Sequence, residues 1–239
     1  NIPEGVVTSK AGLRQYHAEK HDEVHIEEEN IKEELEQLEY PLNFLDYETF
    51  APFVPLFDGY RPHQKMVFQY SLHIQEKPDG KFKHYSYLAK DWEDPSKKLV
   101  KDLKEKIKDK GSVIAWYMSF EKGRNSEMGE RYPEYMSFFE DINNRMFDLM
   151  NVFKKGYYVH KDFHGSASLK RVLPVIVPEL SYGDLEIHEG MEASNKWRDM
   201  VDPKTNKKES EQIYNNLLKY CELDTLAMVK ILERLNKLI

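Results

Sequence analysis

Apolar residues along the chain follow two different repeats, and each repeat predicts one kind of element. Continuous or alternating apolar runs are typical of strands, whereas apolar residues three or four apart are typical of helices. The runs typical of strands lie at residues 42–46, 65–74, 82–88, 113–117 and 146–149. The spacing typical of helices lies at residues 26–38, 94–110, 119 onward, 133–143, 166–173 and 210–238.

The order of these elements predicts an α/β fold with a mixed sheet. The segment Pro78-Asp79-Gly80 is a turn signal between two runs rich in β-forming residues, so residues 65–88 are expected to form an antiparallel hairpin. The later strands alternate with helices, which favours parallel pairing for them. We therefore expect one mixed β-sheet, an antiparallel hairpin plus parallel strands, flanked by helices.

Three segments break the periodic pattern. Residues 1–24 show no sustained periodicity, so they are expected to form a loose arm or linker. Together with the short acidic helix they make an N-terminal segment, 1–39, ahead of one domain at 40–239. Residues 181–208 are polar and are expected to form a loop, and the helix before them is expected to end or kink at Pro174.

Composition narrows the class of protein. With 40% hydrophobic and 13% aromatic residues, a packed core is feasible. The single cysteine, Cys221, excludes an internal disulfide framework and a cysteine zinc cluster. The net charge of -7 argues against coating nucleic acid through bulk positive charge. No apolar run reaches bilayer length and no signal peptide is visible, so we expect a cytoplasmic protein without a membrane partner.

Two carboxylates stand at the end of a predicted buried strand. Side chains alternate along a strand, so Asp46 and Glu48 point the same way. Like charges this close cost free energy unless a cation lies between them, and a hard divalent ion prefers carboxylate oxygens. The alternative is a strand end with one carboxylate turned to water, and for an isolated Asp-x-Glu that alternative is the commoner case.

Further carboxylates fall on two other predicted elements. Tyr220 and Asp224 are four residues apart on the last helix, so they share one face. Glu121 lies at a junction between a strand and a helix. Together with Asp46 and Glu48, these side chains supply four carboxylates and one phenol from three elements. Such a set can converge on a pair of metal ions.

The order and spacing of these motifs resemble those of the DEDD 3′–5′ exonucleases, in the DEDDy branch, whose third motif begins with tyrosine. The three motifs are Asp46-x-Glu48, Tyr117-x-x-Phe120-Glu121 and Tyr220-x-x-x-Asp224. The chain is also similar to an uncharacterised bacterial branch known as a domain of unknown function. That similarity lies in residues 68–73, 168–174 and 220–228. The resemblance covers about residues 40–239 and implies a ribonuclease H-like fold.

The resemblance implies hydrolysis of single-stranded nucleic-acid 3′ ends, DNA or RNA, with two divalent metal ions, Mg²⁺ or Mn²⁺. Asp46 is expected to bridge the ions, Glu48 and Asp224 to hold the first, and Glu121 to hold the second. The Tyr220 hydroxyl is expected to orient the attacking water, since a phenol is a better positioner than base at neutral pH. Because residues 1–24 look like a linker, an upstream domain, fused to the chain or associated with it, is also expected.

The second motif departs from the family pattern. Tyr117 stands where asparagine is common, and Glu121 stands where aspartate is common. Glutamate is one methylene longer and still reaches a position near the second metal. The alternative function is therefore a catalytically silent module of the same fold that binds nucleic acid or a protein partner.

Several other side chains have both a functional and a structural interpretation. Tyr47, Phe50 and Phe53 are suited either to stack on a terminal base or to pack in the core. Lys170 is suited either to contact a phosphate or to remain solvated. Histidines outside these motifs do not fall at metal-ligand spacing and are expected to be structural: His63, His73 and His164.

Overall fold

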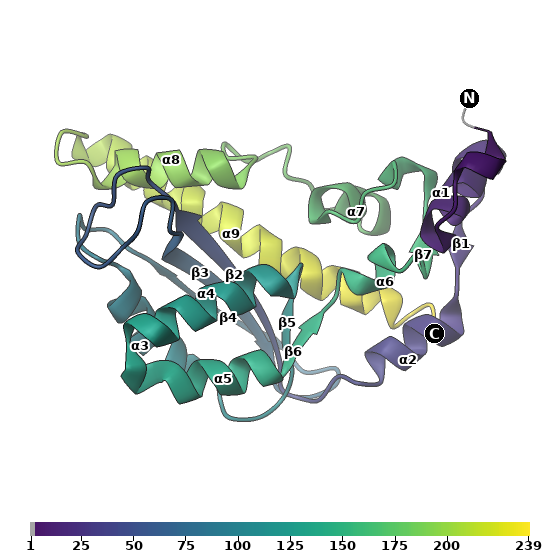
Figure 1. Ribbon diagram of the computed structural model, residues 1–239, viewed down its shortest axis with the longest axis horizontal. Helices are drawn as coiled ribbons and strands as arrows, with labels where there is room; N and C mark the ends of the chain where they lie inside the picture. The colour runs from purple at the N-terminus through teal and green to yellow at the C-terminus, as the bar shows by residue number, and fades with distance from the viewer. Residues whose placement is uncertain (1–2) are drawn as a thin grey trace.

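The computed structural model describes residues 3–239 and shows a mixed sheet flanked by helices (Figure 1). Its strands are β1 (His25–Ile26), β2 (Leu42–Phe50), β3 (Met66–Gln75), β4 (Phe82–Leu88), β5 (Val113–Ala115), β6 (Met146–Asp148) and β7 (Tyr158–Val159). Its α-helices are α1 (Lys10–His21), α2 (Glu28–Leu35), α3 (Ser96–Lys106), α4 (Met118–Arg131), α5 (Met136–Asn144), α6 (Asn151–Lys154), α7 (Leu169–Ile176), α8 (Gly190–Val201) and α9 (Lys207–Leu235). Short 3-10 helices lie at η1 (Glu4–Val6), η2 (Pro133–Tyr135) and η3 (Lys161–Phe163).

The central sheet has the strand order β4-β3-β2-β5-β6. The pairs β2–β3 and β3–β4 are antiparallel, whereas β2–β5 and β5–β6 are parallel. Asp79 adopts a left-handed φ of 56° in the turn between β3 and β4, as the turn signal predicted. The predicted mixed α/β fold and its hairpin are therefore confirmed, and β2 lies at the centre of the sheet.

Helices cover both faces of the sheet, so β2 is buried on both sides. Leu45 and Tyr47 pack with apolar side chains of α3, α4 and α5. Phe44 packs on the other face with side chains of α7 and α9. Figure 1 shows α9 running along one face of the sheet, with α3, α4 and α5 on the other. By alternation, Asp46 and Glu48 share the face of Phe44 and point towards α9.

The structure corrects the prediction of a loop across residues 181–208. Helix α8 forms there, and Ala193, Trp197, Met200 and Val201 are buried on one face. These four residues fall at helical spacing, but a short apolar stripe surrounded by polar residues gives a weak signal. The helix begins beside the end of β2, so it helps to enclose that end of the strand.

Trp197 holds α8 to the sheet, and we expect Trp197→Ala to destabilise the fold by about 3–5 kcal/mol. Its ring stacks on Phe68 at a centroid distance of 4.7 Å, and its Nε1 donates to the Ala89 carbonyl. Urea unfolding measures the change. The matched control is Trp92→Ala, since Trp92 is exposed and its loss should cost less than about 0.5 kcal/mol. Equal costs for both variants would contradict this assignment.

The prediction of a loose arm at residues 1–24 is wrong for residues 10–21, which form α1; residues 1–2 lie outside the described part. The side chain of Ser9 caps this helix by accepting from the Gly12 amide. Arg14 donates to the Gly156 carbonyl and pairs with Glu27. Polar contacts rather than an apolar stripe therefore fix α1. The domain boundary at residue 40 stays a prediction.

Two further boundaries differ from the sequence prediction. Helix α7 does not end at Pro174 but continues to Ile176, with Pro174 inside it. Proline lacks an amide proton, which removes one helical hydrogen bond without preventing the turn from closing. Strand β5 ends at Ala115 rather than residue 117, because Tyr117 adopts a left-handed φ of 73° at the start of α4. That turn directs the first residues of α4 towards β2.

Candidate functional site

Asp46 and Glu48 lie in the C-terminal half of β2, and the structure brings them together as predicted. Glu48 is buried, and Asp46 is only partly exposed. The first residue of α8, Gly190, lies next to Glu48, since a Cβ added to it would be in van der Waals contact with Oε2 at 3.8 Å. The pair is thus enclosed between the sheet, α8 and α9.

Helix α9 contributes the next side chains. Cys221 Sγ lies 3.7 Å from Asp46 Oδ2, which fixes this part of α9 directly over β2. Ligand atoms of Asp46, Glu48 and Cys221 all lie within 4.8 Å of one another. Asp224 and Tyr220 are buried on the same helix, one turn apart. The third predicted motif therefore faces the first one.

Glu121 reaches the same region from the first turn of α4. It is 2% exposed, and its Oε2 atom has no hydrogen-bond partner among the described residues. The junction before it is held by Asp148, whose Oδ1 accepts from the Tyr117 amide at 3.0 Å and from the Met150 amide. A buried carboxylate oxygen without a partner is costly, so this atom points to a missing cation or donor.

The pKa values show that these carboxylates influence one another. Burial raises the pKa of Asp46 well above its ordinary value, and the Asp224, Glu48 and Glu121 carboxylates raise it further. Burial and Asp224 raise the pKa of Glu48, against the lowering effect of Lys170. Burial raises the pKa of Glu121 to about 8 and that of Asp224 to about 6. Near neutral pH the group cannot ionise fully unless cations balance it.

Hydrogen bonds orient the phenol and one carboxylate. Lys170 donates from Nζ to the Tyr220 hydroxyl at 3.0 Å, and it also donates to the His188 carbonyl. The Tyr182 hydroxyl donates to Asp224 Oδ1 at 2.5 Å. Burial and the nearby Asp224 raise the pKa of Tyr220 above its ordinary value. Tyr220 is therefore a neutral hydrogen-bond donor at physiological pH.

These residues fit divalent ions that prefer oxygen ligands, such as Mg²⁺ or Mn²⁺. The donor set consists of four carboxylates, and one oxygen of Glu121 is buried without a partner among the described residues. Burial and Asp46 raise the pKa of the Cys221 thiol, so it stays protonated and donates to Asp46.

The predicted substrate contacts separate into two groups. Tyr47 and Phe50 are 3% and 7% exposed, and the Tyr47 hydroxyl donates to Asn125 Oδ1. Their burial favours the core alternative over stacking on a base. Lys170 is exposed but reaches the acidic site through its contact with Tyr220, and Phe53 is exposed on the loop after β2.

Tyr182 was missed by the sequence analysis. It lies between α7 and α8, in the segment expected to be a loop, and nothing local marks it as a partner of Asp224. The contact joins residues 42 positions apart, so only the packed fold reveals it. A tyrosine in an otherwise polar stretch is the one weak signal that the sequence offers.

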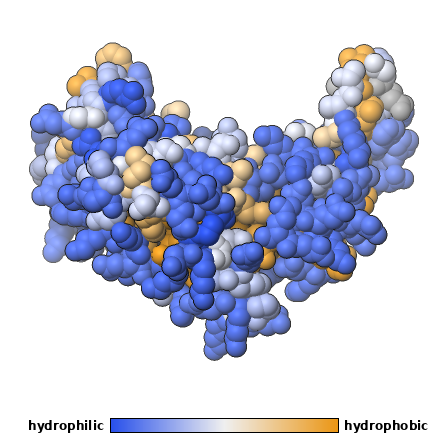
Figure 2. All heavy atoms as spheres, turned by 60° about the horizontal axis from the view of Figure 1, so that its bottom comes forward, coloured by the Kyte–Doolittle hydropathy of each residue, from blue (hydrophilic) through white to orange (hydrophobic). Residues whose placement is uncertain are grey.

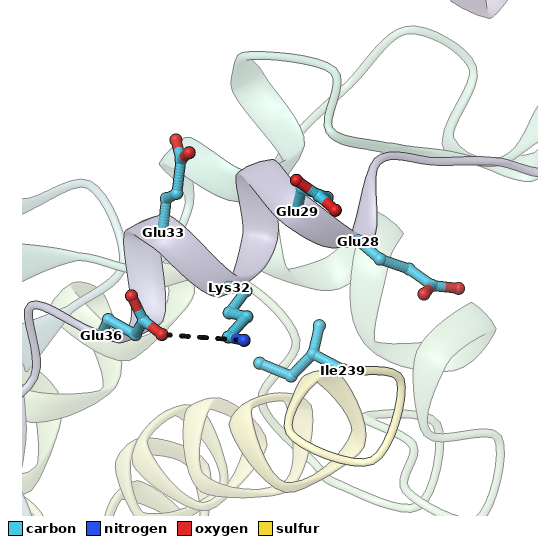
Figure 3. A pocket seen from close by; sticks show the side chains of 6 residues that line it. All are labelled: Glu28, Glu29, Lys32, Glu33, Glu36 and Ile239. Carbon is cyan, nitrogen blue, oxygen red and sulfur yellow. Dashed lines mark ion pairs between the residues drawn. The ribbon is translucent and has the colours of Figure 1, made fainter.

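Two other surfaces carry no comparable chemistry. The acidic helix α2 and the chain end at Ile239 border a shallow hollow, where Lys32 pairs with Glu36 and the other glutamates face solvent (Figure 3). Acidic side chains of this kind are typical of a solvated helix face. Most of the surface seen in Figure 2 is hydrophilic. Within residues 3–239, none of the helices is long and apolar enough to cross a membrane.

Comparison with known proteins gives a family but no activity. A family model described as "Domain of unknown function (DUF2779)" matches residues 43–168, more than half of the chain. The chain is 27% identical over 206 residues to "Uncharacterized protein MG366" of Mycoplasma genitalium, covering 79% of this chain and 31% of that protein. It is 26% identical over 215 residues to "Uncharacterized protein UU173" of Ureaplasma parvum, covering 82% and 31%. The chain thus spans about a third of these curated relatives. No solved structure matches it.

Proposed function

The chain belongs to the DUF2779 family, whose description assigns no activity, and we propose from the acidic site that it is a metal-dependent 3′–5′ exonuclease-like phosphodiesterase. Two observations support this proposal most directly. Asp46 and Glu48 lie together on β2, and the Asp224 and Glu121 carboxylates, from α9 and α4, lie close enough to raise the pKa of Asp46. An antiparallel β4-β3-β2 half joined to a parallel β2-β5-β6 half is also the arrangement expected of a ribonuclease H-like sheet. The 3′–5′ direction follows from the resemblance of the three motifs.

The carboxylates would hold the metal ions, with Asp46 between Glu48 and Asp224 on one side and Glu121 on the other. Bound ions supply the positive charge that stabilises the attacking and leaving oxygens of a phosphodiester. Three of the four side chains are buried and Asp46 is half-buried, so their mutual repulsion calls for a positive counter-charge. Tyr182 keeps Asp224 oriented through its hydrogen bond.

Tyr220 and Lys170 would position the reacting groups. Because Lys170 donates to the Tyr220 oxygen, the phenolic proton remains available to a water molecule or a phosphate oxygen. The raised pKa of Tyr220 keeps that proton in place. Tyr220 therefore orients a reactant and does not act as the base.

Local positive charge supports a polyanionic substrate despite the net charge of -7. Lys65 lies over the Phe120 ring at 4.4 Å from its centroid, next to Glu121, and Arg124 lies over the same ring while pairing with Glu127. A lysine in this position could contact a phosphate, which would fix the position of a strand without reading its sequence. Enclosure of Asp46 and Glu48 by α8 and α9 favours a narrow single-stranded end over a duplex.

Incubation with 5′-labelled single-stranded oligonucleotides, DNA and RNA in parallel, tests this function. With Mn²⁺ we expect a ladder that shortens from the 3′ end, and with a chelator we expect intact substrate. If Mn²⁺ raised the melting temperature but no substrate shortened, the exonuclease proposal would fail. The silent binding module would then explain the site better.

Tyr220→Phe is expected to lower kcat by about 10- to 100-fold, since it removes a positioning hydroxyl but leaves the carboxylates unchanged. The measurement is the initial rate of oligonucleotide shortening at saturating Mn²⁺. Asp46→Asn provides the lower reference, because it removes a proposed metal ligand. A loss as large as that of Asp46→Asn would show that Tyr220 does more than orient a reactant.

A further inference from the structure

A second group of possible metal ligands lies on the same face of the sheet, towards its β4 edge. His73 of β3 and His84 of β4 are paired across the hairpin, and their rings stack at a centroid distance of 4.4 Å. Glu222 of α9 lies above them. One nitrogen of each ring and one carboxylate oxygen of Glu222 all lie within 4.8 Å of one another.

Hydroxyl groups beneath the two rings hydrogen-bond one nitrogen of each ring. Thr225 Oγ1 lies 2.7 Å from Ser71 Oγ, 2.8 Å from His73 Nδ1 and 3.1 Å from the Glu222 carbonyl. Ser71 Oγ lies 2.9 Å from His84 Nε2. When Thr225 donates to the Glu222 carbonyl, each neutral ring donates to the hydroxyl that it contacts.

This arrangement leaves an unshared electron pair on the opposite nitrogen of each ring. For His84 that nitrogen is Nδ1, which lies 3.6 Å from Glu222 Oε1. A cation between such a nitrogen and the carboxylate oxygen would be attracted to both. The three side chains thus offer two imidazole nitrogens and one carboxylate oxygen within 4.8 Å of one another.

We propose that His73, His84 and Glu222 bind a divalent transition-metal ion of the zinc class. Imidazole nitrogen suits zinc, and two histidines with one carboxylate form a known type of zinc ligand set. Metal-binding histidines usually donate their second ring N–H to another group, and the hydroxyls of Ser71 and Thr225 lie at hydrogen-bond distance from one nitrogen of each ring. Because the side chains of His84 and Glu222 are 25% and 46% exposed, water can complete the coordination.

The proposed zinc site would tie α9 to the β3–β4 hairpin. Glu222 lies between Tyr220 and Asp224 in the sequence, so an ion held by Glu222 would restrain the helix that carries both residues. The ligand atoms differ from those of the acidic site. Zinc binding here therefore holds or fails independently of the exonuclease proposal.

Calorimetric titration of metal-free protein with ZnCl₂ tests the site. The protein carries Asp46→Asn, so that zinc binding at the acidic site adds less to the measured heat. We expect one zinc ion per chain, and at least ~10-fold weaker binding in His84→Ala and Glu222→Gln. The matched control is Glu211→Gln, an exposed carboxylate on the same helix, which should bind zinc unchanged. Unchanged affinity in His84→Ala and Glu222→Gln would overturn the proposal.

Ser71→Ala separates ligand positioning from folding. It keeps all three proposed ligands and removes the hydroxyl that hydrogen-bonds His84 Nε2, so zinc should bind about 10- to 100-fold more weakly. Circular dichroism checks that this variant and His84→Ala remain folded. Cobalt(II) provides a second readout, since nitrogen-ligated cobalt gives visible absorption bands. These bands should persist in Asp46→Asn and disappear in His84→Ala; persistence in both would contradict the assignment.

Discussion

Replacing Asp46 with asparagine is expected to abolish metal-dependent hydrolysis and, at the same time, to stabilise the metal-free protein. Asp46 contacts Cys221 and raises the pKa of its neighbours by its negative charge. Asparagine keeps the shape of the side chain but removes that charge. The proposed bridging ligand is lost, so activity should fall by about 10³-fold or more. Repulsion within the acidic site falls too, so the fold gains stability near neutral pH.

Both effects can be measured on one preparation. Each kcal/mol gained should raise the melting temperature by about 2–4 °C in a domain of this size, in buffer containing a chelator. Mn²⁺ should raise the melting temperature of the wild type more than that of Asp46→Asn. Asp184→Asn is the matched control, since Asp184 begins a second Asp-x-Glu but is exposed. If Asp46→Asn kept full turnover, the acidic site could not be where hydrolysis takes place.

The sequence predicted the site where the chemistry follows from alternation and helical spacing. Asp46 and Glu48 had to share a face of β2, and Tyr220 had to lie one turn from Asp224. The hairpin was predictable because Pro78-Asp79-Gly80 marks its turn. These features depend only on residues close together in the sequence, so strand alternation, helical spacing and turn signals are enough to predict them.

Contacts between distant segments lay beyond those rules. The pairing of His73 with His84 depends on the register of the hairpin, and their contact with Glu222 depends on how α9 crosses it. Spacing along the chain gives no sign of either, so His73 was expected to be only structural. The sequence analysis did not predict helix α1 for a related reason: the helix is held in place by a polar contact between distant residues, in which Arg14 donates to the Gly156 carbonyl. Its apolar stripe is too short to predict a helix.

The metal-free protein should lose stability as pH rises from 6.5 to 8. Glu121 has a pKa of about 8 when folded, against an ordinary value of 4.5, so in this range only the folded state keeps its proton. Stability falls wherever the folded state binds more protons, here by about 1.4 kcal/mol per pH unit. The expected loss from Glu121 is about 2 kcal/mol, and Asp46 and Glu48 act in the same direction.

The pH window matters because His73 has the opposite effect at lower pH. Burial lowers its pKa to about 4, so between pH 4 and 6.5 the unfolded state binds the extra proton and stability rises with pH. Above pH 6.5 the contribution of His73 to stability is constant, and the carboxylates determine how stability changes with pH.

Melting curves at pH 6.5 and 8 in chelator should therefore differ by several degrees, and Glu121→Gln should reduce the difference. Mn²⁺ should raise the melting temperature more at pH 8, because ionised carboxylates bind it better. A melting temperature of the metal-free protein that rises between pH 6.5 and 8 would mean that these carboxylates already have a counter-charge within the protein.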